Sequence, residues 1–163
     1  MINKPPFLPC LLNRLLDNEP KKQQEPWDKF HYGQNKMRTL IQQNIIDILN
    51  NTNIESQLDP VHHNNVVESV LNYGVAPLMG NYIGAQQWKI LEQSVRAALI
   101  RFESRLRPHS LMLILEGDKR SPSCNGIISF NIRALVYWSP QPFDLSLRAR
   151  YDTETEVTTV TAA

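Results

Sequence analysis

The sequence predicts an α+β fold, in which three amphipathic helices pack on a small antiparallel sheet that ends in a long β-hairpin. Before residue 107, apolar residues recur at steps of three and four, as they do along one face of a helix. After residue 110, apolar residues either run together or alternate with polar ones, which is typical of strands. The chain therefore divides into a helical half and a β half.

Three stretches of the first half are expected to be helical. The first begins near residue 35 and carries the apolar residues Met37, Leu40, Ile41, Ile45, Ile48 and Leu49. The second follows the helix-start pair Asp59-Pro60 and ends at Gly74, with a buried face of Val66, Val67, Val70 and Leu71. The longest lies between residues 86 and 106, with the apolar face Trp88, Leu91, Val95, Ala98, Leu99, Phe102 and Leu106. A length of about 25 Å lets it support a sheet.

Three strands are expected after Pro108. Residues 111–115 form a short apolar run, whereas residues 128–138 and 143–151 alternate between apolar and polar side chains. The last two form a hairpin from Ile127 to Tyr151, whose inward side chains are led by Phe130, Ile132, Val136, Leu145 and Leu147. A free edge of this hairpin would be a template for strand addition by another chain, unless the C-terminal tail covers it.

These elements predict three parts of the chain. Residues 1–34 are an appendage, in which an amphipathic stripe with Leu11, Leu12 and Leu15 precedes a polar linker. The stripe either folds back on its own domain or docks in a groove of a partner. Residues 35–151 form the domain. Residues 152–163 are threonine-rich and either form a tail or extend the last strand.

The composition excludes several classes of function. The 163 residues carry 17 basic and 16 acidic side chains, so no overall field favours nucleic acid or anionic lipid. Proteins or neutral ligands are the expected partners. Cys10 and Cys124 lack a CxxC spacing and are expected to be reduced thiols, which points to the cytoplasm. Prolines interrupt the apolar run near the N-terminus, so direct insertion into a membrane is not expected.

No residue pattern predicts catalysis or a metal site. Glu103, Glu116 and Asp118 are the carboxylates near the helix-to-sheet junction, but their spacing does not define the geometry of a glycosidase pair. His62 and His63 are adjacent, so they point to different faces of a helix and do not share a metal. The GxSxG, GxxxxGK[ST] and HExxH motifs are absent from the sequence. A protein without catalytic residues, cofactor or metal is therefore expected.

Three short motifs resemble a known family. They are the sequences Phe102-Glu103-Ser104-Arg105-Leu106, Ser69-Val70-Leu71-Asn72-Tyr73-Gly74 and Leu11-Leu12-Asn13-Arg14-Leu15. Together with the closing strands, they resemble the TssE-like proteins of type VI secretion baseplates, which belong to the phage baseplate wedge "lysozyme-like" family. Members of this family usually have Glu-Pro-Arg where this chain has Glu103-Ser104-Arg105. The rigid turn that a proline would impose is therefore not expected here.

The resemblance implies a structural protein that joins baseplate wedges, rather than a catalyst. Its partners would be the wedge subunits TssF and TssG, with TssK in the same complex, and the sheath subunits TssB and TssC. Its fold would be similar to the strand-exchanging domain of contractile sheath subunits, so that it could start sheath assembly. It would lie in the cytoplasm, at a baseplate docked on the inner-membrane complex. A peptidoglycan-cleaving lysozyme-like enzyme and a binding adaptor on the same fold are the alternatives.

Three groups of residues are expected to bind these partners. Glu103 and Arg105 are expected to point in different directions at a helix end, each pairing with a charge of a wedge subunit. The stripe with Leu11, Leu12 and Leu15 is expected to dock away from the core. The outward arginines Arg133, Arg148 and Arg150 of the hairpin are expected to select an acidic neighbour during strand addition. Arg148 is assigned to an outward edge position, where proline would hurt strand addition more than folding.

Overall fold

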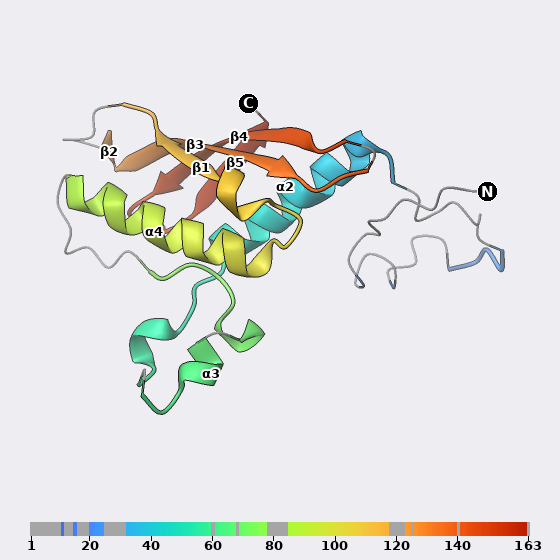
Figure 1. Cartoon of the computed structure of the whole chain (residues 1–163). Coiled ribbons are helices and arrows are strands. Elements are labelled where there is room, and N and C mark those ends of the chain that lie inside the picture. The colour runs from blue at the N-terminus through green and yellow to red at the C-terminus, as the bar shows by residue number, and fades with distance from the viewer. Residues whose placement is uncertain are drawn as a thin grey trace.

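The computed structural model describes residues 11, 15, 20–24, 32–59, 61–67, 69–77, 85–117, 123–124, 126–139 and 141–162. These residues form the helices α2 (Gln34–Asn50), α3 (Asn64–Val67) and α4 (Ala85–Phe102) and the strands β1 (Met112–Leu115), β2 (Ser123–Cys124), β3 (Ile127–Val136), β4 (Phe143–Asp152) and β5 (Thr158–Ala162). Figure 1 shows two layers, with the sheet on one side and both long helices on the other. The predicted α+β class is confirmed.

The sheet is antiparallel, with the strand order β1-β3-β4-β5 and the short β2 beside β1 on the same side of β3. Strands β3 and β4 pair along their whole length, from Ile127↔Asp152 to Val136↔Phe143. Strand β5 then pairs with β4, from Leu147↔Ala162 to Tyr151↔Thr158. The sequence suggested that the sheet ends in the hairpin, but the structure adds β5 beyond it.

The strand β5 forms because the chain reverses directly after β4. The side chain of Asp152 accepts hydrogen bonds from the main-chain N–H groups of Glu154 and Thr155, and Glu156 takes a positive φ of 56°. The N–H of Asp152 then donates to the carbonyl of Val157. Asp and Thr in such a run favour a tight turn of this kind, so residues 158–162 fold back along β4.

The core lies between the sheet and the two long helices. Helix α4 buries Trp88, Leu91, Val95, Ala98 and Leu99, and helix α2 buries Met37, Ile41, Ile45, Ile48 and Leu49, as their periodicity predicted. The inward hairpin residues Phe130, Ile132, Val136, Leu145 and Leu147 are buried as well. The rings of Trp88 and Phe130 join the two layers at 5.5 Å between centroids. The alternation of strands β3 and β4 therefore confirms which face meets the helices.

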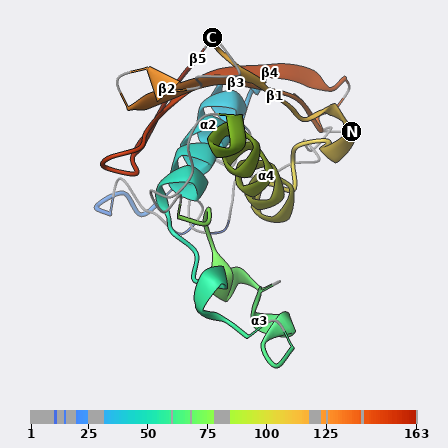
Figure 2. The same cartoon turned by 90° about the vertical axis from the view of Figure 1, so that its left-hand side faces the viewer.

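The second predicted helix is wrong for most of its length. The described residues between 53 and 74 form the single turn α3 between two 3₁₀ turns, Glu55–Gln57 and Val70–Asn72. Val70 and Leu71, assigned to a buried face, are exposed. The reason is that Ser69 bonds the N–H of Leu71 and the carbonyl of Val66, so its side chain takes the place of helical bonds. Residues 53–74 instead form a lobe that projects away from the sheet (Figure 2).

Candidate partner-binding surfaces

Glu103 and Arg105 form an ion pair with each other directly after α4. The guanidinium of Arg105 donates from Nε and Nη2 to the two carboxylate oxygens of Glu103, at 2.6 Å each. The amide of Asn44 on α2 donates to the same carboxylate at 3.4 Å. The side chain of Glu103 is 2% exposed and that of Arg105 is 13% exposed. A two-pronged bond of this kind is among the stronger polar contacts in proteins.

The expectation that these two side chains point in different directions is therefore wrong. The N–H of Leu106 donates to the carbonyl of Glu103, which closes a tight turn and brings residue 105 back over residue 103. The segment then joins the end of β3, because Tyr137 N donates to Arg105 O and Arg107 N donates to Leu135 O, both at 2.8 Å. The turn thus forms without the proline of the family motif, with Ser104 exposed between the paired charges.

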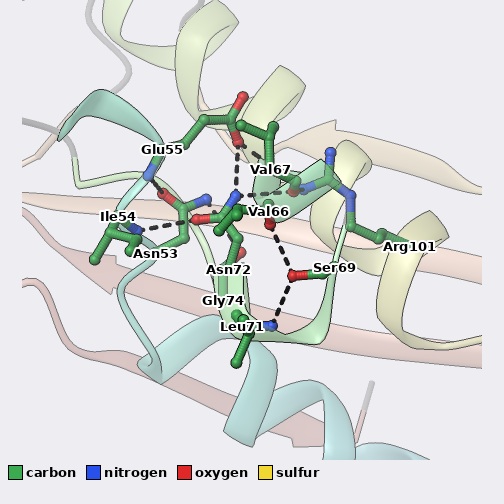
Figure 3. Close-up of polar contacts among 10 residues, drawn as sticks. All are labelled: Asn53, Ile54, Glu55, Val66, Val67, Ser69, Leu71, Asn72, Gly74 and Arg101. Carbon is green, nitrogen blue, oxygen red and sulfur yellow. Dashed lines mark hydrogen bonds and ion pairs between the residues drawn. The ribbon is translucent and has the colours of Figure 1, made fainter. Parts of the chain in front are cut away.

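The lobe is held together by the buried side chain of Asn72 (Figure 3). Its oxygen accepts from Ile54 N at 3.1 Å, and its nitrogen donates to Val67 O at 3.1 Å and to Glu55 Oε2 at 3.3 Å. Arg101 reaches across from α4, donates to the same Val67 carbonyl at 2.8 Å, and lies 3.9 Å from the Glu55 carboxylate. Asn72 therefore holds the lobe together, and Arg101 fixes it to helix α4.

The neck of the lobe requires a glycine. Gly74 has a φ of +112°, and a Cβ built on it would lie 2.0 Å from the main-chain oxygen of Asn51. Asn51 O accepts from Val75 N at 2.8 Å, so the two ends of the lobe are bonded side by side. This close approach explains the glycine of the Ser69-to-Gly74 motif, while the exposed Val70 and Leu71 lie on the surface of the lobe.

One edge of the sheet is closed by helix α2. The outward main-chain groups of β5 are those of Thr158, Val160 and Ala162, because Asp152 N bonds Val157 O and the pairing alternates from there. The amide of Asn50 bonds both the N–H of Thr158, at 2.8 Å, and its carbonyl, at 3.0 Å. Gln42 donates to the carbonyl of Val160 at 3.5 Å. The C-terminal strand thus covers β4, and α2 covers the C-terminal strand.

The opposite edge is open within the described part of the chain. Glu116 N bonds Ser129 O, so the main-chain groups of the even-numbered residues of β1 bond β3. The main-chain groups of the odd-numbered residues point away from β3, toward the edge of the sheet. The carbonyl of Leu111 accepts from Arg96 Nη1 at 2.8 Å. The outward N–H and carbonyl groups of Leu113 and Leu115 have no hydrogen-bond partner among the described residues. An unpaired row of this kind is a template for a further strand.

The three arginines of the hairpin lie on the face of the sheet that points away from the helices. Arg148 donates to Glu116 Oε2 from Nη2 at 2.6 Å and from Nε at 2.9 Å, and Asn131 donates to Oε1 at 2.9 Å. The bond from Arg148 lowers the pKa of Glu116. Arg133 and Arg150 are exposed, and within the described ranges neither has an ion-pair partner.

The assignment of Arg148 to a free edge is wrong. Arg148 lies in β4 between two strands, opposite Asn131 on β3 and Thr161 on β5. Its N–H points toward β5, because the pairing of β4 with β5 alternates from the Asp152–Val157 bond. A proline at this position would therefore remove a bond inside the sheet, so it cannot separate strand addition from folding.

Other predicted residues are placed as follows. Leu11 and Leu15 are 65% and 70% exposed, so neither side chain is part of the core, and partner binding through them remains a prediction. Leu12, Cys10 and Asp118 lie outside the described residues. Glu103 is buried against α2, whereas Glu116 bonds Asn131 on the opposite face of the sheet, so these two carboxylates do not share a cleft. In the described ranges, no cluster of metal-ligating side chains and no helix able to span a membrane is found.

Among the described residues, the β1 edge and the sheet face opposite the helices are uncovered, and an unpaired edge is a site where another chain can add a strand. A family model described as "Baseplate wedge protein gp25" matches residues 35–141, about two thirds of the chain. The chain therefore belongs to the baseplate wedge protein gp25 family, a family of structural proteins of baseplates, and the resemblance carried by its motifs is confirmed. The matched range includes the Ser69-to-Gly74 and Phe102-to-Leu106 motifs but not Leu11 to Leu15. No curated protein and no solved structure matches the chain.

Proposed function

We propose that this protein joins the wedge subunits of a type VI secretion baseplate and provides the first template for its contractile sheath. The family supports a structural role in a baseplate. The proposed wedge partners are TssF and TssG, with TssK in the same complex, and the proposed sheath partners are TssB and TssC. The assembly would lie in the cytoplasm, against the inner-membrane complex.

The observation that carries the template is the difference between the two sheet edges. Asn50 and Gln42 bond both outward groups of Thr158 and the carbonyl of Val160, so helix α2 lies where a strand from another chain would pair with β5. At β1 the outward groups of Leu113 and Leu115 are free among the described residues. Main-chain groups of this kind give affinity for an added strand with little demand on its sequence. The sheath strand is therefore assigned to β1 and not to the hairpin.

The wedge contact is assigned to the turn that Glu103 and Arg105 form. Their ion pair fixes residues 103–107 between α2 and the end of β3, with Ser104 exposed at the surface. A wedge subunit would then recognise a preformed turn, which lowers the ordering cost of binding. Substitution of Glu103 or Arg105 would change the shape of the turn and thereby weaken this contact. The effect of such a substitution on binding must therefore be measured separately from its effect on folding.

The test of the template uses a proline at residue 115 of β1. Leu115→Pro removes the outward N–H, which bonds no described residue, and leaves the even-numbered bonds to β3. The control is Leu115→Ala, which removes more apolar surface than the proline does but keeps the N–H. Sheath formation is counted in cells that carry a fluorescent sheath subunit, and wedge incorporation is followed by co-purification with TssF and TssG.

The expected result is loss of sheaths with Leu115→Pro and near-normal sheaths with Leu115→Ala, while both variants still co-purify with the wedge. Circular dichroism and thermal unfolding of both purified variants confirm that they fold. If a folded Leu115→Pro variant supports sheaths at the same frequency as Leu115→Ala, the β1 edge is not the template. If wild-type protein does not co-purify with wedge subunits, the proposed role in a type VI baseplate is wrong.

A further inference from the structure

The face of the sheet opposite the helices has no element packed on it in the described part of the chain (Figure 2). Its side chains form rows across the strands, which the register defines. One row is Met112, Arg133 and Ser146; the next is Ile114, Asn131, Arg148 and Thr161; the third is Glu116, Ser129, Arg150 and Thr159. We call these eleven residues the outer face.

The outer face is apolar on one side and basic on the other. Strand β1 contributes the exposed side chains of Met112 and Ile114, and strand β4 contributes Arg148 and Arg150. Between them, β3 contributes the smaller side chains of Ser129 and Asn131. Neighbouring strands lie about 4.8 Å apart, so the apolar and basic columns are about 10 Å apart, and we call the surface along β3 between them the trough. The Glu116 carboxylate crosses the trough at its middle row, because it bonds both Asn131 and Arg148, so a partner would lie on top of this bridge.

A hollow marks one end of this trough. It is lined by Met112, Arg133, Leu135, Asp144 and Ser146, among other residues. Leu135 lies opposite Asp144 in the row beyond Arg133, so the hollow continues the trough along β3. The trough therefore has apolar, basic and concave parts within one uncovered surface.

The charge of the outer face is not neutralised within the described chain. Glu116 bonds Arg148, which accounts for one of the three arginines. Arg133 and Arg150 form no salt bridge with a described residue, but Arg150 is attracted to the Glu116 carboxylate, and Asp144 lines the hollow together with Arg133. Among the described residues, the three guanidiniums therefore face two carboxylates, so the surface keeps a net positive charge next to the exposed side chains of Met112 and Ile114. An acidic partner with an apolar stripe is complementary to this pattern.

We infer that the outer face is a docking site for an acidic amphipathic α-helix of another protein. The helix lies along β3, with apolar side chains on Met112 and Ile114 and carboxylates on one flank against Arg133 and Arg150. A helix is inferred because an extended segment pairs with an edge, whereas a face is covered by side-chain packing across its width. This site is separate from the β1 edge, so one molecule can bind a strand and a helix at the same time.

The test measures binding of two synthetic peptides to the full-length chain by fluorescence anisotropy. Both peptides are amphipathic helices with the same leucine stripe, and one flank carries glutamates in the first and lysines in the second. The acidic peptide is expected to bind about tenfold more tightly than the basic one, and more weakly at high salt. Arg133→Glu, Arg150→Glu and Ile114→Ser are each expected to weaken its binding about tenfold.

Matched controls come from the helical layer. Ile100 on α4 is 43% exposed, as is Ile114, so Ile100→Ser controls for loss of an exposed isoleucine. Lys89→Glu on the same helix controls for the change in net charge. Both control variants are expected to bind the acidic peptide as the wild type does. NMR amide shifts on binding are expected in the outer-face rows.

Three outcomes would overturn the inference. The first is equal binding, or no binding, of the two peptides. The second is an equal loss of binding in the control variants, or amide shifts that map to another surface. The third is tighter peptide binding after deletion of residues 1–20, because the face is then occupied by this chain's own N-terminal segment. A wild-type dimer that Ile114→Ser dissociates would count in the same way, because the face is then occupied by a second copy.

Discussion

At the β5 edge of the sheet, a helix supplies the hydrogen bonds that a neighbouring strand would make. The side chain of Asn50 bonds both main-chain groups of Thr158, as a paired residue would. At the β1 edge, the corresponding groups of Leu113 and Leu115 meet no described residue. Among the described residues, one edge is therefore protected against pairing and the other is not, so the proposed strand addition has a defined side.

The most severe way to break this difference is to remove β5. Deleting residues 158–163 exposes the β4 edge and removes the buried side chains of Thr158 and Val160 together with their bonds to α2. We expect a loss of about 4 kcal/mol in the free energy of unfolding, from one aliphatic side chain and several hydrogen bonds. Urea unfolding measures the loss. The newly opened edge should also cause self-association, detectable by sedimentation, and an unchanged monomer would contradict the protective role of β5.

The second prediction tests how much the ion pair between Glu103 and Arg105 contributes to the free energy of unfolding, for comparison with the contacts of the closed β5 edge. Arg105→Met leaves the Glu103 carboxylate buried without its main partner, so we expect a loss of about 3 kcal/mol. Arg150→Met is the control, because Arg150 is exposed and forms no ion pair in the described chain. The double variant Glu103→Leu/Arg105→Met should recover part of the loss. Equal unfolding free energies for Arg105→Met and Arg150→Met would mean that the pair adds nothing to stability.

The third prediction concerns the amide that closes the β5 edge. Asn50→Ala removes both bonds to Thr158, and we expect a loss of about 2 kcal/mol, since each bond contributes about 1 kcal/mol net. Gln43→Ala is a suitable control, because among the described residues this exposed α2 side chain bonds Asp47 on its own helix and no other element. Hydrogen exchange should show faster exchange of the Thr158 amide in Asn50→Ala than in Gln43→Ala. No difference at Thr158 would show that the edge is closed by other means.

The smallest expected effect concerns Glu116, which directly follows the open strand β1. Arg148 lowers the pKa of Glu116 below its usual value, so the native state holds the ionised carboxylate more strongly than the unfolded chain does. The resulting stabilisation is present above the unfolded pKa and is lost as the pH falls through the folded pKa. Because the pair lies at the surface, we expect less than about 1 kcal/mol. Urea midpoints at neutral and acidic pH should change less in Glu116→Gln than in wild type; equal changes would contradict it.

Local patterns in the sequence were sufficient for the elements of the core. The spacing of Met37, Ile41 and Ile45 placed one helix against the sheet, because side chains three and four positions apart share a face. The alternation around Phe130 and Leu145 identified the inner face of the hairpin for the same geometric reason. The lobe was mispredicted because polar side chains such as Ser69 and Asn72 replace helical bonds with their own.

By itself, the sequence determined the class of fold, the faces of α2, α4 and the hairpin, and the motifs that mark the family. Each of these depends on residues close together in the chain. The tertiary structure alone decided which edge of the sheet is covered and that the Glu103 carboxylate is buried against α2. Asn50 and Thr158 are 108 positions apart, and Asn44, whose amide bonds the Glu103 carboxylate, is 59 positions away from it. No local period records such contacts, because they arise when distant elements pack.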